Sequence, residues 1–240
     1  FQLACMTLPY AAFSFERSLT GIKSAGFEQV AWGVNHLGKR LLEEKATARE
    51  ARALAERTRS TGLEPVMMFS TVHLEARDAL DLHRRRIEQA AAAQMPFLLT
   101  FGKTEAGDYA SVIRNLQGMA AAARDTGVMV LVKQHGGNSG TGAACAKIVA
   151  EVGAASVRVC YDAGNVLDYE NTDPIADLRT CWRDVRAFCI KDHRNWPKDE
   201  DCGPGFGEID HYKLLEPVMR TGLTMPLAFE NIFEPLLPRP

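Results

Sequence analysis

The chain has 240 residues, of which 46% are hydrophobic and 24% are charged, a composition typical of a globular protein with a sizeable core. Its formal net charge of −2, with no long basic run, argues against nucleic acid or an anionic membrane as the partner. No apolar stretch approaches the roughly 20 residues that a membrane-spanning helix needs. The six cysteines form no Cys-x-x-Cys pair, which favours buried, reduced thiols. We expect a cytoplasmic protein whose N-terminus, beginning at Phe1, has been trimmed.

One unit recurs along the chain: an amphipathic helix, then in most cases a glycine, then a short apolar run. A glycine after a helix adopts the left-handed conformation without a Cβ penalty. The apolar runs show no polar alternation, as expected of strands covered on both faces. The predicted helices span Ser14–Ala25, Ala46–Thr61, Glu75–Gln94, Asp108–Thr126, Ala143–Val152, Asp173–Val185 and Asp210–Thr221. The predicted strands span Gln2–Thr7, Phe27–Trp32, Pro65–Phe69, Pro96–Phe101, Val128–Lys133, Val157–Asp162, Ala187–Lys191 and Met225–Glu230.

Strands that alternate with helices of this length imply parallel pairing through right-handed crossovers. Eight such strands either close into a barrel or form an open doubly wound sheet. No Gly-x-Gly-x-x-Gly follows the first strand, which disfavours a dinucleotide-binding open sheet. We therefore predict an α/β fold, a single (β/α)8 TIM barrel over residues 1–240. Its eighth helix is expected to be missing, because three prolines after Glu230 forbid a regular helix.

Polar residues gather at the ends of the last four predicted strands, which share one mouth in a parallel barrel. They are Lys133, Gln134 and His135, then Asp162 and Asn165, then Lys191, Asp192 and His193, and finally Glu230. Trp32, Phe69 and Phe101 end earlier strands and are expected to form an apolar wall for a sugar ring. Buried carboxylates are costly unless they are paired or bind a metal, so Asp162 and Glu230 predict a functional site. The alternative is a structural salt bridge that closes the barrel.

Five short motifs resemble those of the xylose-isomerase-like TIM barrel superfamily, in the expected order from the fifth strand to the eighth. They are Lys-Gln-His-Gly-Gly at 133–137, Tyr-Asp-Ala-Gly-Asn at 161–165, Ile-Lys-Asp at 190–192, Gly-Phe-Gly-Glu-Ile-Asp at 205–210 and Phe-Glu at 229–230. That superfamily includes sugar epimerases, inositol-catabolic dehydratases and isomerases, and apurinic endonucleases. The resemblance implies a divalent cation, manganese, magnesium or zinc, held by Glu, Asp, His and Glu at the ends of the last four strands.

Two of those four ligand positions keep their residue here. Asp162 and Glu230 match the family's Asp and last Glu, whereas Lys133 stands at the first Glu and Cys189 at the His. A lysine ammonium between two carboxylates can supply the missing positive charge. We therefore predict that Lys133 lies within ion-pair reach of Asp162 or Glu230. A metal, if bound, would use Asp162, Glu230 and His135.

The resemblance implies an isomerase or epimerase acting on a small sugar, keto-sugar or polyol by proton abstraction next to a carbonyl. Glu230 would be the base, and Lys133, Lys191 or a metal would stabilise the enediolate. Asn165, His193, Trp32, Phe69 and Phe101 would contact the substrate. The alternatives are a lyase or hydrolase acting on an oxidised sugar, and a non-catalytic sugar-binding barrel with a degenerate metal site. The expected partner is a small sugar-like substrate, with no nucleic acid and no membrane, and the chain is a possible homo-oligomer.

Two loops and one helix invite further predictions. The glycine-rich run 136–142 could offer backbone amides to an anion. The segment Asn195–Phe206 is long for a connection and is expected to be a mobile lid, the alternative being a rigid loop with a turn at Gly203-Pro204-Gly205. His83, within Asp-Leu-His-Arg-Arg-Arg, is predicted to lie on a solvated helix face.

Overall fold

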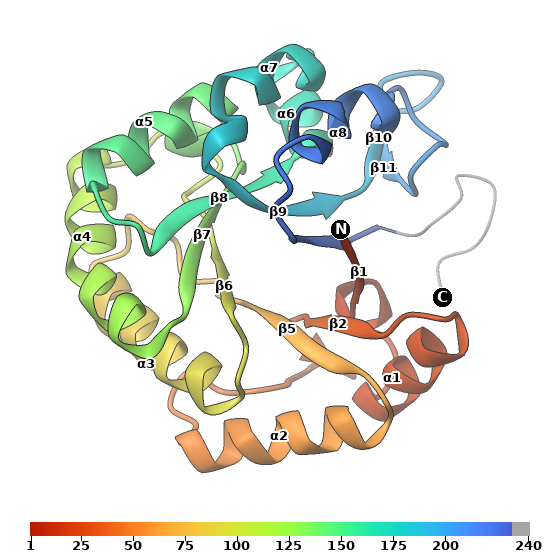
Figure 1. The fold of residues 1–240 in the computed structure, drawn as a ribbon, viewed down its shortest axis with the longest axis vertical. Helices are drawn as coiled ribbons and strands as arrows, with labels where there is room; N and C mark the ends of the chain where they lie inside the picture. The colour runs from red at the N-terminus through yellow and green to blue at the C-terminus, as the bar shows by residue number, and fades with distance from the viewer. Residues whose placement is uncertain (232–240) are drawn as a thin grey trace.

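Eight parallel strands close into a barrel in the computed structural model, which describes residues 1–231 (Figure 1). Around the barrel the order is β1, β2, β5, β6, β7, β8, β9, β12, and β12 pairs back with β1. The barrel strands are β1 (Gln2–Met6), β2 (Gln29–Trp32), β5 (Glu64–Phe69), β6 (Phe97–Thr100), β7 (Met129–Lys133), β8 (Val157–Asp162), β9 (Val185–Ile190) and β12 (Pro226–Phe229). The predicted (β/α)8 barrel is confirmed.

Helices surround the barrel on the outside (Figure 1). They are α1 (Phe15–Ser24), α2 (Ala48–Ser60), α3 (Ala79–Ala92), α4 (Tyr109–Thr126), α5 (Gly142–Val152), α6 (Ala163–Glu170), α7 (Pro174–Cys181) and α8 (His211–Met219). The sequence did not predict α6, because Gly164 and Asn165 are weak helix formers. The helix expected to be missing after Glu230 falls on residues 232–240, outside the described residues.

The residues at the helix ends explain why the helix–glycine–strand repeat could be recognised in the sequence. Thr47 and Glu50 form a capping box at the start of α2, which satisfies backbone amides that the helix leaves free. Gly127 ends α4 with φ of 74°, a left-handed conformation that a side chain would strain. These residues therefore determine where α2 begins and where α4 ends.

Two apolar layers hold the barrel together, one inside the strands and one between strands and helices. Ala31 belongs to the inner layer, whereas its neighbour Trp32 packs outward against Phe15 of α1, with ring centroids 6.3 Å apart. The expectation that Trp32 lines the mouth is therefore wrong. Both faces of β2 are apolar, so the sequence carries no alternation that would have revealed which side chains point inward.

His83 is fully buried in α3, not solvated as expected. One of its ring nitrogens, Nε2, lies 2.7 Å from Thr100 Oγ1 on β6, and Nδ1 lies 2.7 Å from Ala79 O. Burial lowers the pKa of His83 to about 4, so the ring is neutral at pH 7. The neutral imidazole thus links α3 to β6 through Thr100. The arginines that follow His83 in the sequence made this helix face look solvent-exposed.

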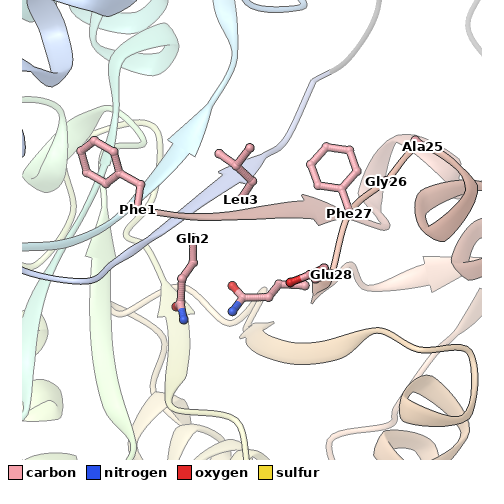
Figure 2. Close-up of a pocket in the computed structure, with 8 residues that line it drawn as sticks. Phe1, Gln2, Leu3, Ala25, Gly26, Phe27 and Glu28 are labelled. Carbon is pink, nitrogen blue, oxygen red and sulfur yellow. The ribbon is translucent and has the colours of Figure 1, made fainter.

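The remaining features of the described chain agree with a reduced globular barrel. All six cysteines are free and buried, as expected. No helix within residues 1–231 is long and apolar enough to cross a membrane. A surface pocket lined by Gln2, Phe27 and Glu28 lies at the amino ends of β1 and β2, away from the strand ends that carry the polar cluster (Figure 2).

Two antiparallel hairpins rise from the loops. One pairs β3 (Asn35–His36) with β4 (Lys39–Arg40), and the other pairs β10 (Asp192–Arg194) with β11 (Glu200–Cys202). The second hairpin contains most of the segment that was expected to be a lid. Its second strand brings Asp201 back to Lys191, the residue that directly follows β9.

Candidate active site at the carboxyl ends of the strands

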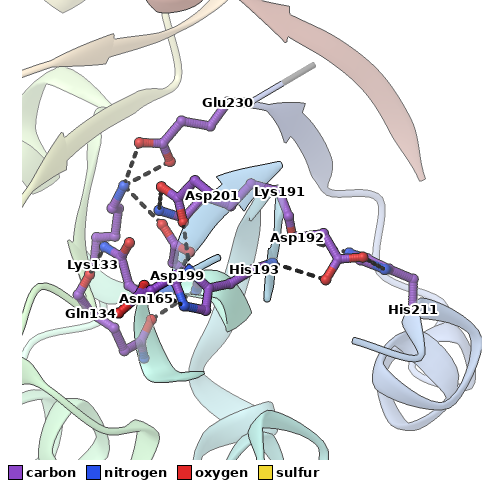
Figure 3. Close-up of polar contacts among 11 residues, drawn as sticks. Lys133, Gln134, Asn165, Lys191, Asp192, His193, Asp199, Asp201, His211 and Glu230 are labelled. Atoms are coloured by element: carbon purple, nitrogen blue, oxygen red, sulfur yellow. Dashed lines mark hydrogen bonds and ion pairs between the residues drawn. The ribbon is translucent and has the colours of Figure 1, made fainter. Parts of the chain in front are cut away.

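Lys133 lies at the centre of the candidate site, on the last position of β7 (Figure 3). Three carboxylate oxygens surround its ammonium: Asp162 Oδ2 at 2.8 Å, Glu230 Oε1 at 2.8 Å and Glu230 Oε2 at 2.7 Å. Asp162 ends β8, and Glu230 directly follows β12. The predicted ion pair is therefore confirmed, and it involves both carboxylates. The two contacts with Glu230 are hydrogen bonds, and the contact with Asp162 is an ion pair.

Because the cluster is largely buried, its charges strongly affect the pKa values of Lys133 and Glu230. Lys133 is 3% exposed and Asp162 is fully buried. Burial alone would lower the pKa of Lys133, but Asp162, Cys189 and Glu230 raise it well above its usual value. Burial alone would raise the pKa of Glu230, yet Lys133 and Lys191 together lower it to about 2. Lys133 is therefore protonated and Glu230 ionised over the physiological pH range.

Backbone and amide contacts fix Asp162 in place. As the N-cap of α6, its Oδ1 accepts a hydrogen bond from Asn165 N at 3.0 Å, while Gln134 Oε1 accepts one from Asp162 N at 2.9 Å. The Asn165 side chain donates to Gln134 O at 2.7 Å and is 2% exposed. The structure thus places Asn165 as a buried clamp between the ends of β7 and β8. Its predicted contact with a substrate stays a prediction.

A second polar cluster lies beside the first, on the β10–β11 hairpin (Figure 3). Lys191 Nζ lies 2.7 Å from Asp201 Oδ2, and His193 Nδ1 lies 3.2 Å from Asp201 Oδ1. Burial alone would lower the pKa of Lys191, but Asp162 and Glu230 raise it, so this lysine is also a fixed cation. The ammonium of Lys191 pairs with the hairpin, whereas that of Lys133 pairs with the strand ends.

His135 faces an aromatic wall. Its ring centroid lies 4.4 Å from that of Phe101, 5.5 Å from that of Tyr169 and 6.3 Å from that of His73. Burial, and then the charge of Lys133, lower its pKa, so the ring is neutral at pH 7. Phe69 extends the apolar side, its ring lying 5.8 Å from Lys133 Nζ. Phe69 and Phe101 thus belong to the inner layer, whereas Trp32 does not, and their predicted contact with a sugar stays a prediction.

Asp192 anchors the hairpin loop. This fully buried carboxylate accepts hydrogen bonds from Gly205 N at 3.0 Å, Ile209 N at 3.1 Å and its neighbour His193 N at 2.9 Å. These amides hold the segment around Gly203-Pro204-Gly205 against the barrel. That part of the expected lid is therefore tied down by a carboxylate, while Trp196 near the hairpin tip is 82% exposed.

Two amides at the start of α5, where the glycine-rich run 136–142 ends, already donate to protein oxygens. Gly142 N donates to Asp177 Oδ2 at 2.7 Å, and Ala144 N donates to Thr141 Oγ1 at 3.1 Å. A Cβ on Gly136 would lie 2.5 Å from Thr104 O, which explains the glycine by close backbone packing. The start of α5 is thus already occupied by protein oxygens.

The metal that the resemblance implies does not fit this centre. Among residues 1–231, Asp162, Cys189 and Glu230 bring ligand atoms within 4.8 Å of one another, but the ammonium of Lys133 bonds both carboxylates at that position. His135 is not part of the group, and its predicted role as a ligand stays a prediction. Burial raises the pKa of the Cys189 thiol well above its usual value, whereas a metal needs the thiolate. A divalent cation would have to displace a buried, fully paired lysine.

The sequence did not single out three residues of this region: Asp168, Tyr169 and Asp201. Asp201 is brought back by the hairpin, and the acidic run Asp199-Glu200-Asp201 within a long loop was the available signal. Asp168 and Tyr169 lie on α6, which was not predicted, so no signal pointed to them.

No curated protein matches the sequence. Similar solved structures include a xylose isomerase domain protein from Planctomyces limnophilus, with a TM-score of 0.76 at 16% identity over 96% of this chain and 90% of that one. A 3-keto-D-glucoside 4-epimerase from E. coli has a TM-score of 0.76 at 14% identity, over 99% and 94% of the two chains. A D-allulose 3-epimerase from Methylomonas sp., solved in complex with D-allulose, has a TM-score of 0.74 at 14% identity, over 99% and 87%.

These likenesses show a shared fold, and the sequence itself supports a family. The family profile described as "Xylose isomerase-like TIM barrel" matches residues 19–235, which is most of the chain. With the closed barrel and the polar strand ends, this match means that the chain belongs to the xylose isomerase-like TIM barrel family.

Proposed function

We propose that the protein is a sugar isomerase that acts on a small aldose or keto-sugar, with Lys133 in place of the metal ion at the centre of the site. The proposal rests on the ammonium of Lys133, which lies 2.7–2.8 Å from Asp162 and Glu230. A buried cation of this kind stabilises an enediolate by the same charge that a metal would supply. Phe69, Phe101 and His135 offer a neutral wall for the carbon face of the sugar.

The substrate must compete for Lys133. For a substrate carbonyl oxygen to accept a hydrogen bond from Lys133 Nζ, one oxygen of Glu230 must lose the hydrogen bond that it accepts from this ammonium. That exchange leaves the Glu230 oxygen free, and it removes part of the interaction that keeps the pKa of this carboxyl near 2. Binding thereby raises the basicity of Glu230 in the complex, which is when a base is needed.

The reaction then moves one proton between neighbouring carbons. Glu230 removes the hydrogen from the carbon next to the carbonyl, and the electron pair moves onto the carbonyl oxygen beside Lys133. The neighbouring hydroxyl proton passes to that oxygen, the second oxygen becomes the new carbonyl, and Glu230 returns its proton to the former carbonyl carbon. Atoms and electrons balance, and no other reactant is needed.

The site favours isomerisation over epimerisation. Inverting one carbon needs a proton donor on the face opposite the base, and Lys133 holds the position of the family's first glutamate. Asp162 and Glu230 together raise the pKa of Lys133 well above its usual value, after the opposing effect of burial, which makes it a poor proton donor at pH 7. One carboxylate that removes and returns the proton on one face is sufficient for an isomerase.

Proton exchange in deuterated buffer tests this function. Chelator-treated protein would be incubated with aldopentoses, aldohexoses and their 2-keto isomers, and NMR would follow loss of the hydrogen next to the carbonyl. We expect exchange and isomer formation with at least one sugar, abolished in Glu230→Gln and kept in Glu216→Gln, an exposed α8 carboxylate. A lyase would instead release a dehydrated product. Exchange unaffected by Glu230→Gln would contradict the proposal.

A non-catalytic sugar-binding barrel is the second candidate, favoured by the low pKa of Glu230, which makes a weak base in the free protein. That reading predicts saturable shifts of ligand resonances with no hydrogen exchange, and the same NMR samples distinguish the two.

A further inference from the structure

A second cluster at the mouth combines carboxylates with a buried imidazole. Asp168 of α6, His193 of β10 and Asp201 of β11 bring ligand atoms within 4.8 Å of one another. Asp199 Oδ1 lies 3.3 Å from His193 Nε2. We propose that this cluster binds a divalent transition-metal cation, manganese or zinc, at a position distinct from the one occupied by Lys133.

The imidazole of His193 provides the observation that points to a ligand. The residue is 1% exposed, and its Nε2 is buried without a hydrogen bond, although Asp199 Oδ1 lies near it. An unsatisfied buried ring nitrogen costs free energy unless a partner is supplied. An imidazole beside two carboxylates is a donor set that suits manganese, iron or zinc rather than magnesium or calcium.

The charges around the cluster also favour a cation. Asp168, Asp199 and Asp201 carry three negative charges, and among the described contacts Lys191 is the lysine paired with them, through Asp201 Oδ2 at 2.7 Å. That ion pair leaves Asp201 Oδ1 facing His193. Lys191 therefore orients the carboxylate through Oδ2, as an outer partner orients a metal ligand, and Oδ1 is turned toward the imidazole of His193.

The hairpin gives the site its position in the fold. His193 pairs with Asp201 across β10 and β11, so two of the proposed ligands are set by one antiparallel register. Asp168 comes from the second turn of α6, on the helix that Asp162 begins. A cation here would join the hairpin to the helix beside the sugar site. The proposal does not depend on the isomerase function, because Glu230 and Lys133 contribute no ligand.

Manganese binding to the chelator-treated, dialysed full chain tests the site, with free Mn²⁺ measured by electron paramagnetic resonance. We expect one equivalent to bind, with at least a tenfold loss of affinity in Asp168→Asn and in His193→Gln. Asp125→Asn, a 65% exposed carboxylate side chain at the end of α4, should bind as the wild type does. Thermal unfolding curves would confirm that each variant is folded, and the partly exposed Asp168 gives the variant least prone to misfold.

Cys189→Ala separates this site from the family position, because Cys189 belongs to the other group of candidate ligands. Unchanged affinity in Cys189→Ala together with loss in Asp168→Asn supports the hairpin site. No binding to the wild type, binding that persists in Asp168→Asn, or binding that is lost in Cys189→Ala overturns it. Isomerase activity in the presence of chelator would be unaffected by any of these outcomes, so the two proposals fail separately.

Discussion

Lys133 and Lys191 occupy comparable places at the carboxyl ends of neighbouring parts of the barrel, yet their surroundings differ. Lys133 bonds two carboxylates from β8 and the end of β12, with almost no exposure for any of the three groups except part of Glu230. Lys191 bonds Asp201, whose side chain is 31% exposed, on a hairpin added above the barrel. The first cluster joins three barrel segments, and the second joins the barrel to a loop.

This difference in burial means that the charge of Lys133 matters more for the stability of the fold than the charge of Lys191. Removing the ammonium of Lys133 would leave two largely buried carboxylates without the cation that lies between them, which is strongly unfavourable. Removing that of Lys191 would leave a carboxylate that water can reach. The buried Lys133 cluster therefore sets the electrostatics of the site, while the Lys191 cluster is the one proposed above to bind a cation.

Replacing each lysine by methionine gives the largest expected contrast. Lys133→Met should lower the free energy of unfolding by about 3–5 kcal/mol, as when one partner of a buried ion pair is removed, and it should abolish sugar proton exchange. Lys191→Met should cost roughly 1 kcal/mol, because Asp201 can be hydrated. Urea unfolding at pH 7 measures both. Equal losses in the two variants would contradict the distinction drawn between the clusters.

The carboxyls of the two clusters should respond to pH with opposite signs. Glu230 has a lowered pKa, near 2, so its stabilising effect is complete above its unfolded-state value of about 4.5 and is lost as the pH falls toward 2. Burial, assisted by Asp201 and Asp199, raises the pKa of Asp168. Ionised Asp168 therefore lowers the free energy of unfolding as the pH rises above the ordinary pKa of an aspartate.

Unfolding of metal-free variants between pH 3 and 7 checks these signs. The stability difference between the wild type and Glu230→Gln should grow with pH, in favour of the wild type. The difference between the wild type and Asp168→Asn should be smaller and should shift in favour of the variant as the pH rises. A Glu230→Gln variant as stable as the wild type at pH 7 would show that Lys133 does not compensate this carboxylate.

Hydrogen exchange should show the smallest contrast. Amides of the segment Asn195–Phe206 near the exposed Trp196 should exchange faster than those of β7 and β8, and should slow when a sugar binds. The amides of Gly205 and Ile209 should be protected even without sugar, because both donate hydrogen bonds to the carboxylate of Asp192. Mass spectrometry of peptides with and without sugar checks this, and equal protection across 195–206 in both states would argue against a lid.

Much of the fold was predictable because helix, glycine and apolar run repeat in a fixed order. The same order placed Lys133, Asp162 and Glu230 at one rim, since parallel strands end on one side of a barrel. The ion pair followed from charge alone: two buried carboxylates need a cation, and a lysine stood in the position of a metal ligand.

What the sequence left out depends on local geometry. The β10–β11 hairpin turns Asp201 back over the mouth, and no periodicity in a short polar loop announces such a register. Trp32 lies on a strand whose two faces are both apolar, so its direction was open. His83 sits among charged neighbours but points to Thr100, where one hydrogen bond outweighs the polar context of the helix.

Restoring the family's metal ligands tests most directly whether Lys133 replaces the metal. Manganese stoichiometry would be compared between the wild type and Lys133→Glu/Cys189→His, with Lys133→Gln/Cys189→His as the control that lacks the carboxylate. We predict one additional equivalent in the Glu/His variant, lost when Glu230→Gln is added, and none in the control. The same stoichiometry in the wild type and the Glu/His variant, with wild-type binding lost in Glu230→Gln, would contradict the account.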